Sequence, residues 1–274
     1  MSDTLDKLEE TLVLGIGDFM KERGFSRAHL GLSGGLDSSL VAYLAVQAVG
    51  AENITCFNMP SRFSSQHSKD DAAEQAAILG CRYEILPIEE IYSTCLSAMS
   101  GLFQNMPFDV AEENLQARIR GTLLMTFSNK FNSMLFATGN KSEIATGYCT
   151  LYGDTCGSFA PIGGLYKTEV FALCNRINAR SLAAGGKAII LQAIIDKPPS
   201  AELRPGQKDE DSLPPYGILD EVLKAYLDEK LSPEEIVKKG WDKELVERVI
   251  KTVNGSEFKR RQMPPILNIA DARD

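Results

Sequence analysis

The sequence predicts an α/β fold, a doubly wound parallel sheet flanked by helices, with helical additions at the N- and C-terminal ends. Two observations carry this prediction. Short apolar runs alternate with segments of helical period through the first half of the 274 residues, a pattern typical of parallel strands joined by crossover helices. A glycine pair, Gly34-Gly35, stands between the first apolar run and the helix after it. With 44% hydrophobic residues, the chain can bury a sizeable core.

The periodicity places the elements in order along the chain. Residues 5–22 repeat apolar side chains at helical spacing, and Gly24 ends that helix. Residues 28–32 form a buried strand, and residues 38–46 belong to the helix that leaves the glycine turn. The other predicted core elements are strands over 54–59, 83–87 and 133–138 and helices over 69–79, 110–131 and 168–180.

We predict a single domain over residues 1–274, with a core sheet at about 28–195. A polar, proline-rich loop at about 196–216 leads to C-terminal helices over 217–262. Ser232-Pro233-Glu234-Glu235 forms a capping box that starts one of these helices. The loop, and the segment near 92–109, are poor in periodic apolar residues, so we expect both to become ordered when substrate binds.

Charge and cysteine content exclude several classes of protein. The net charge of -8 and the pI near 5.0 argue against a nucleic-acid partner, which would require a basic face. The chain shows no secretory signal and no apolar segment long enough for a membrane, so we expect a cytoplasmic protein. The six cysteines include no Cys-x-x-Cys pair, and there are only two histidines. We therefore predict free thiols and no zinc site.

The segment Ser33-Gly34-Gly35-Leu36-Asp37-Ser38 predicts a site for phosphate groups. Glycines between a buried strand and a helix let the backbone approach an anion, and hydroxyls of Ser33, Ser38 and Ser39 add donors. The segment lacks the Gly-Lys-Ser/Thr end of a P-loop, and the chain has no G-x-G-x-x-G. Asp37 would repel a triphosphate unless a cation lay between them, so it predicts Mg²⁺. The alternative is an ordinary turn with a capping serine.

The same segment resembles the signature of the ATP pyrophosphatase superfamily, whose members cleave ATP to AMP and pyrophosphate. Further motifs are similar to those of the NAD synthetase family and occur in the family's order between about residues 28 and 265. The resemblance implies the adenine-nucleotide α-hydrolase-like form of the predicted fold. The motifs are Glu113–Arg120, Thr138–Glu143, Gly147–Asp154, Pro161–Thr168, Pro199–Leu203 and Lys259–Gln262.

The resemblance also implies roles for individual residues. Asp37 and Glu143 would hold Mg²⁺, and Asp154 and Lys167 would be the catalytic residues. The residues implied to bind ATP are Gly31, Leu32, Ser33, Gly34, Gly35, Leu36, Asp37, Ser38, Thr138, Lys167 and Ser200. Those implied to bind deamido-NAD are Asn114, Arg118, Leu151, Asp154, Ser158 and Lys259.

Spacing supports some of these roles independently. Asn114 and Arg118 lie four positions apart and so share one helix face. Thr138 follows a strand, at the edge where doubly wound sheets bind ligands. Without the flanking motifs, Arg118 would be a solvated surface charge, Lys167 a surface lysine and Asp154 a turn residue.

The implied activity is ATP-dependent amidation of deamido-NAD to NAD through an adenylate, with release of AMP and pyrophosphate. Asp154 would attract ammonium and accept a proton, and Lys167 would meet the charge at the α-phosphate. Segments 138–168 and 199–215 are most similar to the synthetase domain of fused glutamine-dependent enzymes, but these 274 residues include no nitrilase-like glutaminase domain. We therefore expect ammonia as the donor, with a glutaminase on a separate chain as the alternative. Phe258 departs from the family pattern, since many ammonia-dependent members have His there.

Competing activities have weaker support. Related tRNA thiolation enzymes usually carry a Cys-x-x-Cys pair and a basic surface, and GMP and asparagine synthetases carry an amidotransferase domain. A regulatory module that binds a nucleotide without turnover would not need a second metal carboxylate. The resemblance further implies a homodimer, to which the helix over 110–131 and the N-terminal helix would contribute.

Overall fold

The computed structural model describes residues 2–104 and 106–269. Its core is a parallel sheet in the spatial order β3-β2-β1-β4. The strands are β1 (Ala28–Gly31), β2 (Ile54–Asn58), β3 (Arg82–Ile85) and β4 (Met134–Leu135). The chain starts at the centre, moves outward to β3 and then returns to the other side of β1 for β4. These two directions confirm the predicted doubly wound α/β fold.

β4 is shorter than the strand predicted over 133–138, because the chain changes its hydrogen-bond partner. The two residues of β4 pair with β1. Just beyond them the amide of Ala137 donates to the carbonyl of Phe159 at 2.9 Å. The segment remains extended, so Thr138 still follows the carboxyl edge of the sheet.

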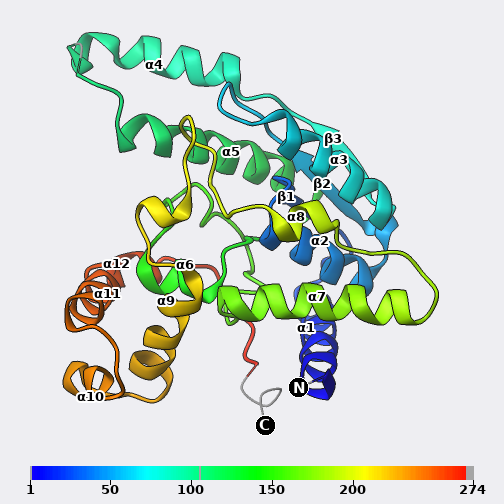
Figure 1. Cartoon of the computed structure of the whole chain (residues 1–274). Helices are drawn as coiled ribbons and strands as arrows, with labels where there is room; N and C mark the ends of the chain where they lie inside the picture. Colours follow the sequence, from blue (N-terminus) through cyan, green and yellow to red (C-terminus); the bar gives the residue numbers. More distant parts are fainter. Residues whose placement is uncertain (1, 105, 270–274) are drawn as a thin grey trace.

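One face of the sheet is covered by helices that share a large buried apolar cluster (Figure 1). α1 buries the stripe Leu8, Leu12, Ile16 and Met20, as its helical spacing predicted. Gly24 has a φ of 72° after α1, which confirms the predicted end of that helix. The helices on this face are α1 (Ser2–Glu22), α2 (Leu36–Val49), α3 (Gln66–Leu79) and α7 (Lys167–Ala183).

The opposite face is covered by α5 (Val110–Phe131), with α4 (Glu89–Phe103) beside it. α5 has the bounds that the sequence predicted. The prediction of a loop over 92–109 is wrong for its first twelve residues, which belong to α4. Ile88 and Tyr92 are buried in a cluster with α5 side chains and anchor one end of this helix. The rest of α4 extends from the body as an arm (Figure 1).

The C-terminal helices form a second, smaller apolar core. Ser232 caps α10 through the predicted capping box, with Pro233 in the first turn. The shorter helices of the second half are α6 (Lys141–Thr146), α8 (Gln192–Asp196), α9 (Tyr216–Leu223), α10 (Pro233–Lys238), α11 (Lys243–Gly255) and α12 (Glu257–Arg260). A π-helical turn over Lys224–Asp228 continues α9, and 3-10 turns lie at Ala51–Asn53 and Asp209–Asp211.

All six cysteines are free thiols, which confirms the absence of a disulfide framework. Across residues 2–104 and 106–269, no helix combines the length and apolar character that crossing a membrane requires.

Candidate active site

The turn between β1 and α2 contains the two glycines of the predicted phosphate site. Gly34 has a φ of 78°, and a Cβ there would lie 2.2 Å from the carbonyl oxygen of Ser68 in α3, so only glycine fits. Gly35 is the N-cap of α2 and brings no side chain to the first amides of the helix. The turn therefore leaves these amides for an anion.

The serine hydroxyls of this turn bond to the turn itself. Ser38 and Ser39 both donate to the carbonyl of Gly35, at 3.0 and 2.8 Å. Ser33 Oγ lies 3.1 Å from Ser38 Oγ and accepts the amide of Gly35 at 3.2 Å. Ser39 is fully buried, so the prediction that it donates to an anion is wrong. Its hydroxyl shapes the loop from within.

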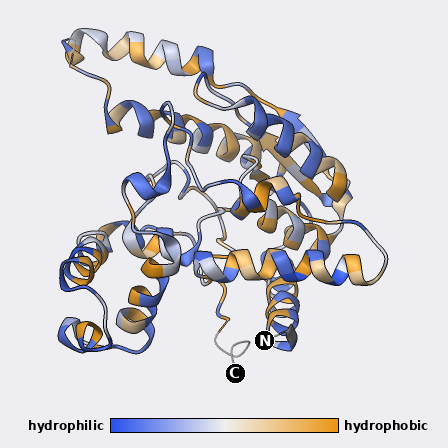
Figure 2. Cartoon of the chain, viewed as in Figure 1, coloured by the Kyte–Doolittle hydropathy of each residue, from blue (hydrophilic) through white to orange (hydrophobic). Residues whose placement is uncertain are grey.

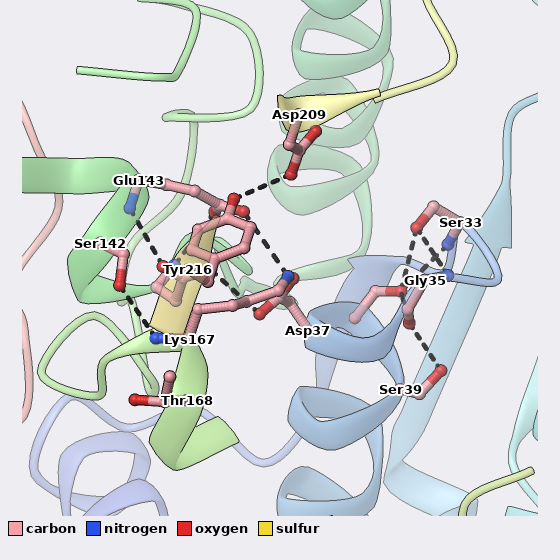
Figure 3. Close-up of polar contacts among 12 residues, drawn as sticks. Ser33, Gly35, Asp37, Ser39, Ser142, Glu143, Lys167, Thr168, Asp209 and Tyr216 are labelled. Atoms are coloured by element: carbon pink, nitrogen blue, oxygen red, sulfur yellow. Dashed lines mark hydrogen bonds and ion pairs between the residues drawn. The ribbon is translucent and has the colours of Figure 1, made fainter. Parts of the chain in front are cut away.

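Three charged side chains from distant parts of the sequence meet beside the turn (Figure 3). Asp37 comes from the first turn of α2, Glu143 from α6, and Lys167 from the first residue of α7. Lys167 Nζ forms an ion pair with Asp37 Oδ2 and lies 3.8 Å from Glu143 Oε1. The side chain of Lys167 is only 3% exposed, and a buried ammonium requires such compensation. We call these three residues the acid-lysine cluster.

Local hydrogen bonds orient the members of the cluster. Asn140 caps α6. Its Oδ1 accepts a hydrogen bond from the backbone amide of Glu143 at 3.0 Å, and its backbone amide donates to the Glu143 carboxylate at 3.3 Å. Asn140 Nδ2 also donates to Asp37 Oδ1 at 3.1 Å. The amide of Lys167 donates to Ser142 Oγ at 2.9 Å. The short helix α6 thus supplies one carboxylate and orients the other two members.

Burial and mutual interaction change the acidity of the cluster. Burial, followed by the neighbouring charge of Asp37, raises the pKa of Glu143 to about 8. Burial disfavours the charge of Lys167, but Asp37 and Glu143 outweigh this effect and raise the pKa of Lys167 above its usual range. Glu143 therefore keeps a proton near neutral pH, and a further cation bound beside it would favour its charged form.

The donor set of the cluster fits Mg²⁺. Asp37 and Glu143 offer carboxylate oxygens, the ligands Mg²⁺ prefers, and the ion usually keeps water and phosphate oxygens as well. The Lys167 ammonium already lies between the two carboxylates, so the position accommodates positive charge. In the described part of the chain, no group of three or more His, Cys, Asp or Glu side chains is placed to hold a metal. An ion here would therefore also need phosphate ligands.

The glycine turn and the acid-lysine cluster line one cavity of about 600 Å³, a size suited to a nucleotide. The polar segment 197–209 lines it from the outer side, and Glu143 and Asp154 also reach it. All residues predicted to bind ATP lie on its wall: Gly31, Leu32, Ser33, Gly34, Gly35, Leu36, Asp37, Ser38, Thr138, Lys167 and Ser200.

Several residues predicted to bind the second substrate lie where α5 meets the loop after α6. Asn114 Oδ1 accepts a hydrogen bond from Thr150 Oγ1 at 2.6 Å. Arg118 Nε donates to the carbonyl of Leu151 at 3.3 Å. Asn114 and Arg118 therefore share one face of α5, as their spacing predicted. Neither they nor Leu151 belong to the described lining of the cavity.

Asp154 belongs to the same loop and does reach the cavity. Asp154 is exposed, and its Oδ1 accepts the backbone amide of Thr150 at 2.6 Å. Desolvation by the protein around the carboxylate raises the pKa of Asp154 to about 6, against the opposing effect of backbone hydrogen bonds. A carboxylate with such a pKa is suited to proton transfer.

The remaining predicted substrate residues have structural contacts. Lys259 Nζ donates to the carbonyls of Gly147 and Cys149, at 2.8 and 2.7 Å. It thereby holds the start of the loop that carries the aspartate. The backbone amide of Ser158 bonds to β4. Phe258 is exposed beside Lys259.

Comparison with known proteins connects this geometry to a family. A family model described as NAD synthase matches residues 8–264. The chain belongs to the NAD synthase family. A glutamine-dependent NAD(+) synthetase of Synechocystis sp. is 50% identical over 271 residues, which cover 99% of this chain and 47% of that protein. The chain thus spans about half the length of the curated relatives it matches.

Solved structures of two similar proteins share the fold. The NH3-dependent NAD synthetase of Campylobacter jejuni superposes with a TM-score of 0.76 at 30% identity, over 96% of this chain and 99% of that one. An NMN synthetase from Francisella tularensis superposes with a TM-score of 0.77 at 28% identity, over 93% and 95% of the two chains. The NAD synthase fold therefore accounts for nearly the whole chain.

In this NAD synthase family member, two residues that the sequence did not predict reach the acid-lysine cluster (Figure 3). They are Asp209 in the polar loop and Tyr216 in α9. Asp209 is 4% exposed and accepts a hydrogen bond from Tyr216 OH at 2.8 Å. Burial raises the pKa of both side chains. The acidic run Asp209-Glu210-Asp211 is visible in the sequence. No pattern in the neighbouring sequence shows which of these three acidic residues is buried.

Proposed function

We propose that this member of the NAD synthase family amidates deamido-NAD to NAD, with ATP as co-substrate and AMP and pyrophosphate as products. The acid-lysine cluster beside the glycine turn carries this proposal. One cavity offers helix N-terminal amides, two carboxylates and a buried ammonium. Together these groups serve a reaction in which charge develops on phosphate oxygens.

In the first step, the carboxylate of deamido-NAD attacks the α-phosphorus of ATP and pyrophosphate leaves. The turn at Gly34 and Gly35 would receive the pyrophosphate on the first amides of α2. Asp37 and Glu143 would hold Mg²⁺, which when bound offsets the charge on the phosphate oxygens. Lys167 supplies a fixed positive charge that the protein has already desolvated.

In the second step, ammonia attacks the acyl adenylate and AMP leaves. Asp154 attracts ammonium and accepts a proton from the attacking nitrogen. Its position on the cavity wall and its pKa of about 6 support this role. The other residues proposed to bind deamido-NAD either belong to the segment that carries Asp154 or form hydrogen bonds with it. They are Leu151 and Ser158 in the segment, and Asn114, Arg118 and Lys259 around it.

We propose free ammonia as the nitrogen donor. The superposition with an NH3-dependent NAD synthetase over 99% of its length supports this. The curated relatives are glutamine-dependent synthetases of which this chain matches about half, so a glutaminase on another polypeptide is the alternative. Purified protein should form NAD faster with ammonium than with glutamine, and the reverse order would overturn this part of the proposal.

We also propose a homodimer, formed through the arm of α4 and the start of α5. Hydrophobic positions lie along this arm (Figure 2), and Leu102, Met106 and Val110 are 72%, 68% and 62% exposed. Monomers rarely leave such apolar surface in water. Light scattering should show a dimer that the double change Leu102→Glu, Val110→Glu converts to a monomer. Leu182→Glu, at an exposed site on α7, should leave the dimer intact, and a monomeric unmodified protein would contradict the proposal.

The decisive experiment measures pyrophosphate release with ATP, Mg²⁺, ammonium and a panel of acceptors. Deamido-NAD should be the preferred acceptor. Nicotinate mononucleotide is the rival, because the fold also matches an NMN synthetase. XMP, aspartate and citrulline complete the panel. Activity with another acceptor and none with deamido-NAD would overturn the assignment.

A further inference from the structure

The polar segment 197–209 is attached to the N-terminus of α3 through Glu202. The Glu202 carboxylate accepts hydrogen bonds from the amide of Ser65 at 3.1 Å, the hydroxyl of Ser65 at 2.8 Å and the hydroxyl of Ser68 at 2.8 Å. Ser65 is the N-cap of α3, so the carboxylate also lies at the positive end of the helix dipole. We call this set of contacts the α3 latch.

We infer that Glu202 is a positioning residue for the nucleotide: the α3 latch holds segment 197–209 over the cavity and so completes the binding site for ATP. The identity of the nucleotide rests on the proposed function. The contacts of the α3 latch lie within the protein and form without a ligand.

The backbone of Glu202 has an uncommon conformation that its contacts hold in place. Glu202 has a φ of 48°, which residues other than glycine adopt only when their surroundings hold them there. The amide of Glu202 donates to Ser200 Oγ at 3.1 Å, and that hydroxyl donates to the carbonyl of Gln207 at 2.6 Å. The latch thus fixes the same turn that presents Ser200, a predicted ATP contact.

The segment has anchors on both sides of the cavity. On the α3 side, Lys197 Nζ bonds to Ser68 Oγ at 3.1 Å and to Asp71 Oδ2 at 2.6 Å. On the α5 side, Gln116 Nε2 donates to the carbonyl of Leu203 at 2.9 Å. Ser68 is also the residue against which the glycine turn packs. The latch is therefore mechanically connected to the proposed pyrophosphate site.

The acid-lysine cluster is built without the latch, since its members come from α2, α6 and α7. Loss of the latch should therefore weaken ATP binding and raise the KM for ATP, while the turnover number at saturating ATP changes little. A general loss of folded structure would lower both together.

Electrostatics alone predicts the opposite effect on binding. Arg120 lines the same cavity, and burial lowers its pKa to about 10 while the charge of Glu202 acts against that lowering. Removing the Glu202 charge makes the cavity less negative, which by itself favours anionic ATP. A variant that binds ATP more weakly therefore reports the lost latch, because the change in charge acts in the other direction.

The test uses the full chain with Glu202→Gln, Ser68→Ala and the double variant. The control is Glu74→Gln, which removes the same charge from an exposed position of α3. Hydrogen exchange of the ligand-free protein measures the mobility of 198–209, and calorimetry with ATP and MgCl₂ measures binding. Each single variant should speed exchange in that segment and weaken ATP binding roughly tenfold, as expected for lost hydrogen bonds to a charged group.

The double variant tests whether the two residues act through one contact. Its loss of ATP affinity should stay well below the product of the two single losses, because partners of one interaction are not additive. Unchanged exchange in Glu202→Gln, fully additive losses, or tighter ATP binding would each overturn the latch. Faster exchange in a protein that binds no ATP in any form would instead refute the proposed nucleotide and leave the latch standing.

Discussion

The carboxylate of Asp220 in α9 accepts a hydrogen bond of 2.5 Å from the hydroxyl of Ser142 in α6. Its other oxygen accepts the amide of Thr168 at 2.8 Å, and Asp220 is fully buried. Ser142 and Thr168 are the sequence neighbours of Glu143 and Lys167. One buried carboxylate of the C-terminal helices therefore sets the spacing between two members of the acid-lysine cluster.

Replacing Asp220 with Asn should lower both stability and turnover. The amide presents a donor where the carboxylate presents an acceptor, so one of the two bonds is lost in a buried place. We expect the free energy of unfolding in urea to fall by about 1.5–3 kcal/mol, and pyrophosphate release to fall roughly tenfold or more because the cluster is misplaced. Asp18→Asn, on the exposed face of α1, should change neither. Turnover at the unmodified rate in Asp220→Asn would show that the cluster keeps its geometry without this bond.

Replacing Asp37 with Asn should abolish most turnover while the fold is kept. The change preserves shape but removes a carboxylate from both Lys167 and the proposed metal. We expect pyrophosphate release to fall by roughly a hundredfold or more. EDTA should stop the unmodified enzyme, and added Mg²⁺ should restore it. Asp70→Asn, an exposed site on α3, serves as the matched control. Near-normal rates in Asp37→Asn would remove this residue from the site.

The rate with ammonia should depend on the ionisation of Asp154. Desolvation by the surrounding protein raises the pKa of this carboxyl from 3.8 to about 6, and a general base must be ionised to act. Turnover should therefore rise with pH through about 6 and level off above it. The measurement requires a constant concentration of free NH3, so that the titration of ammonium does not imitate the profile. Asp154→Asn should lose roughly a hundredfold or more in rate, and a flat profile between pH 5 and 7 would contradict the assignment.

His29 should make stability depend on pH. Its Nε2 lies 3.0 Å from the carbonyl of Leu124 and its Nδ1 lies 2.9 Å from Ser133 Oγ, and burial lowers its pKa from 6.5 to about 4. Between these values the unfolded chain binds a proton that the folded chain does not. The free energy of unfolding contributed by His29 is therefore complete above about pH 6.5 and falls by about 3 kcal/mol as the pH decreases to about 4.

The chain contains two histidines, which provides a matched pair for this test. Urea unfolding from pH 4 to 7 should show a weaker pH dependence in His29→Gln than in the unmodified protein. His67→Gln, at an exposed position of α3, should retain the full dependence. Parallel profiles for His29→Gln and the unmodified protein would show that other groups cause the effect.

The local elements of the fold follow from short windows of sequence. The helix over 110–131, the glycine after α1 and the capping box at Ser232 are where periodicity and capping rules predicted them. α4 was missed although Tyr92, Leu96, Met99 and Phe103 recur along it at helical spacing. Beyond Tyr92 these side chains stay partly or fully exposed and do not join the core of the sheet. The length of β4 also escaped prediction, since it depends on pairing with Phe159.

The glycine turn and the identity of the charged residues were determined by the sequence itself, because Gly34, Asp37 and their neighbours act within one strand-turn-helix unit. The tertiary structure alone decided which groups meet. Asp37 forms hydrogen bonds with Asn140 and Lys167, which lie 103 and 130 positions away in the sequence. Glu202 accepts a hydrogen bond from Ser65, which lies 137 positions away. Burial depth, hydrogen-bond partners and the resulting pKa shifts depend on such contacts. Desolvation is a property of the packed surroundings, and no local window of sequence contains it.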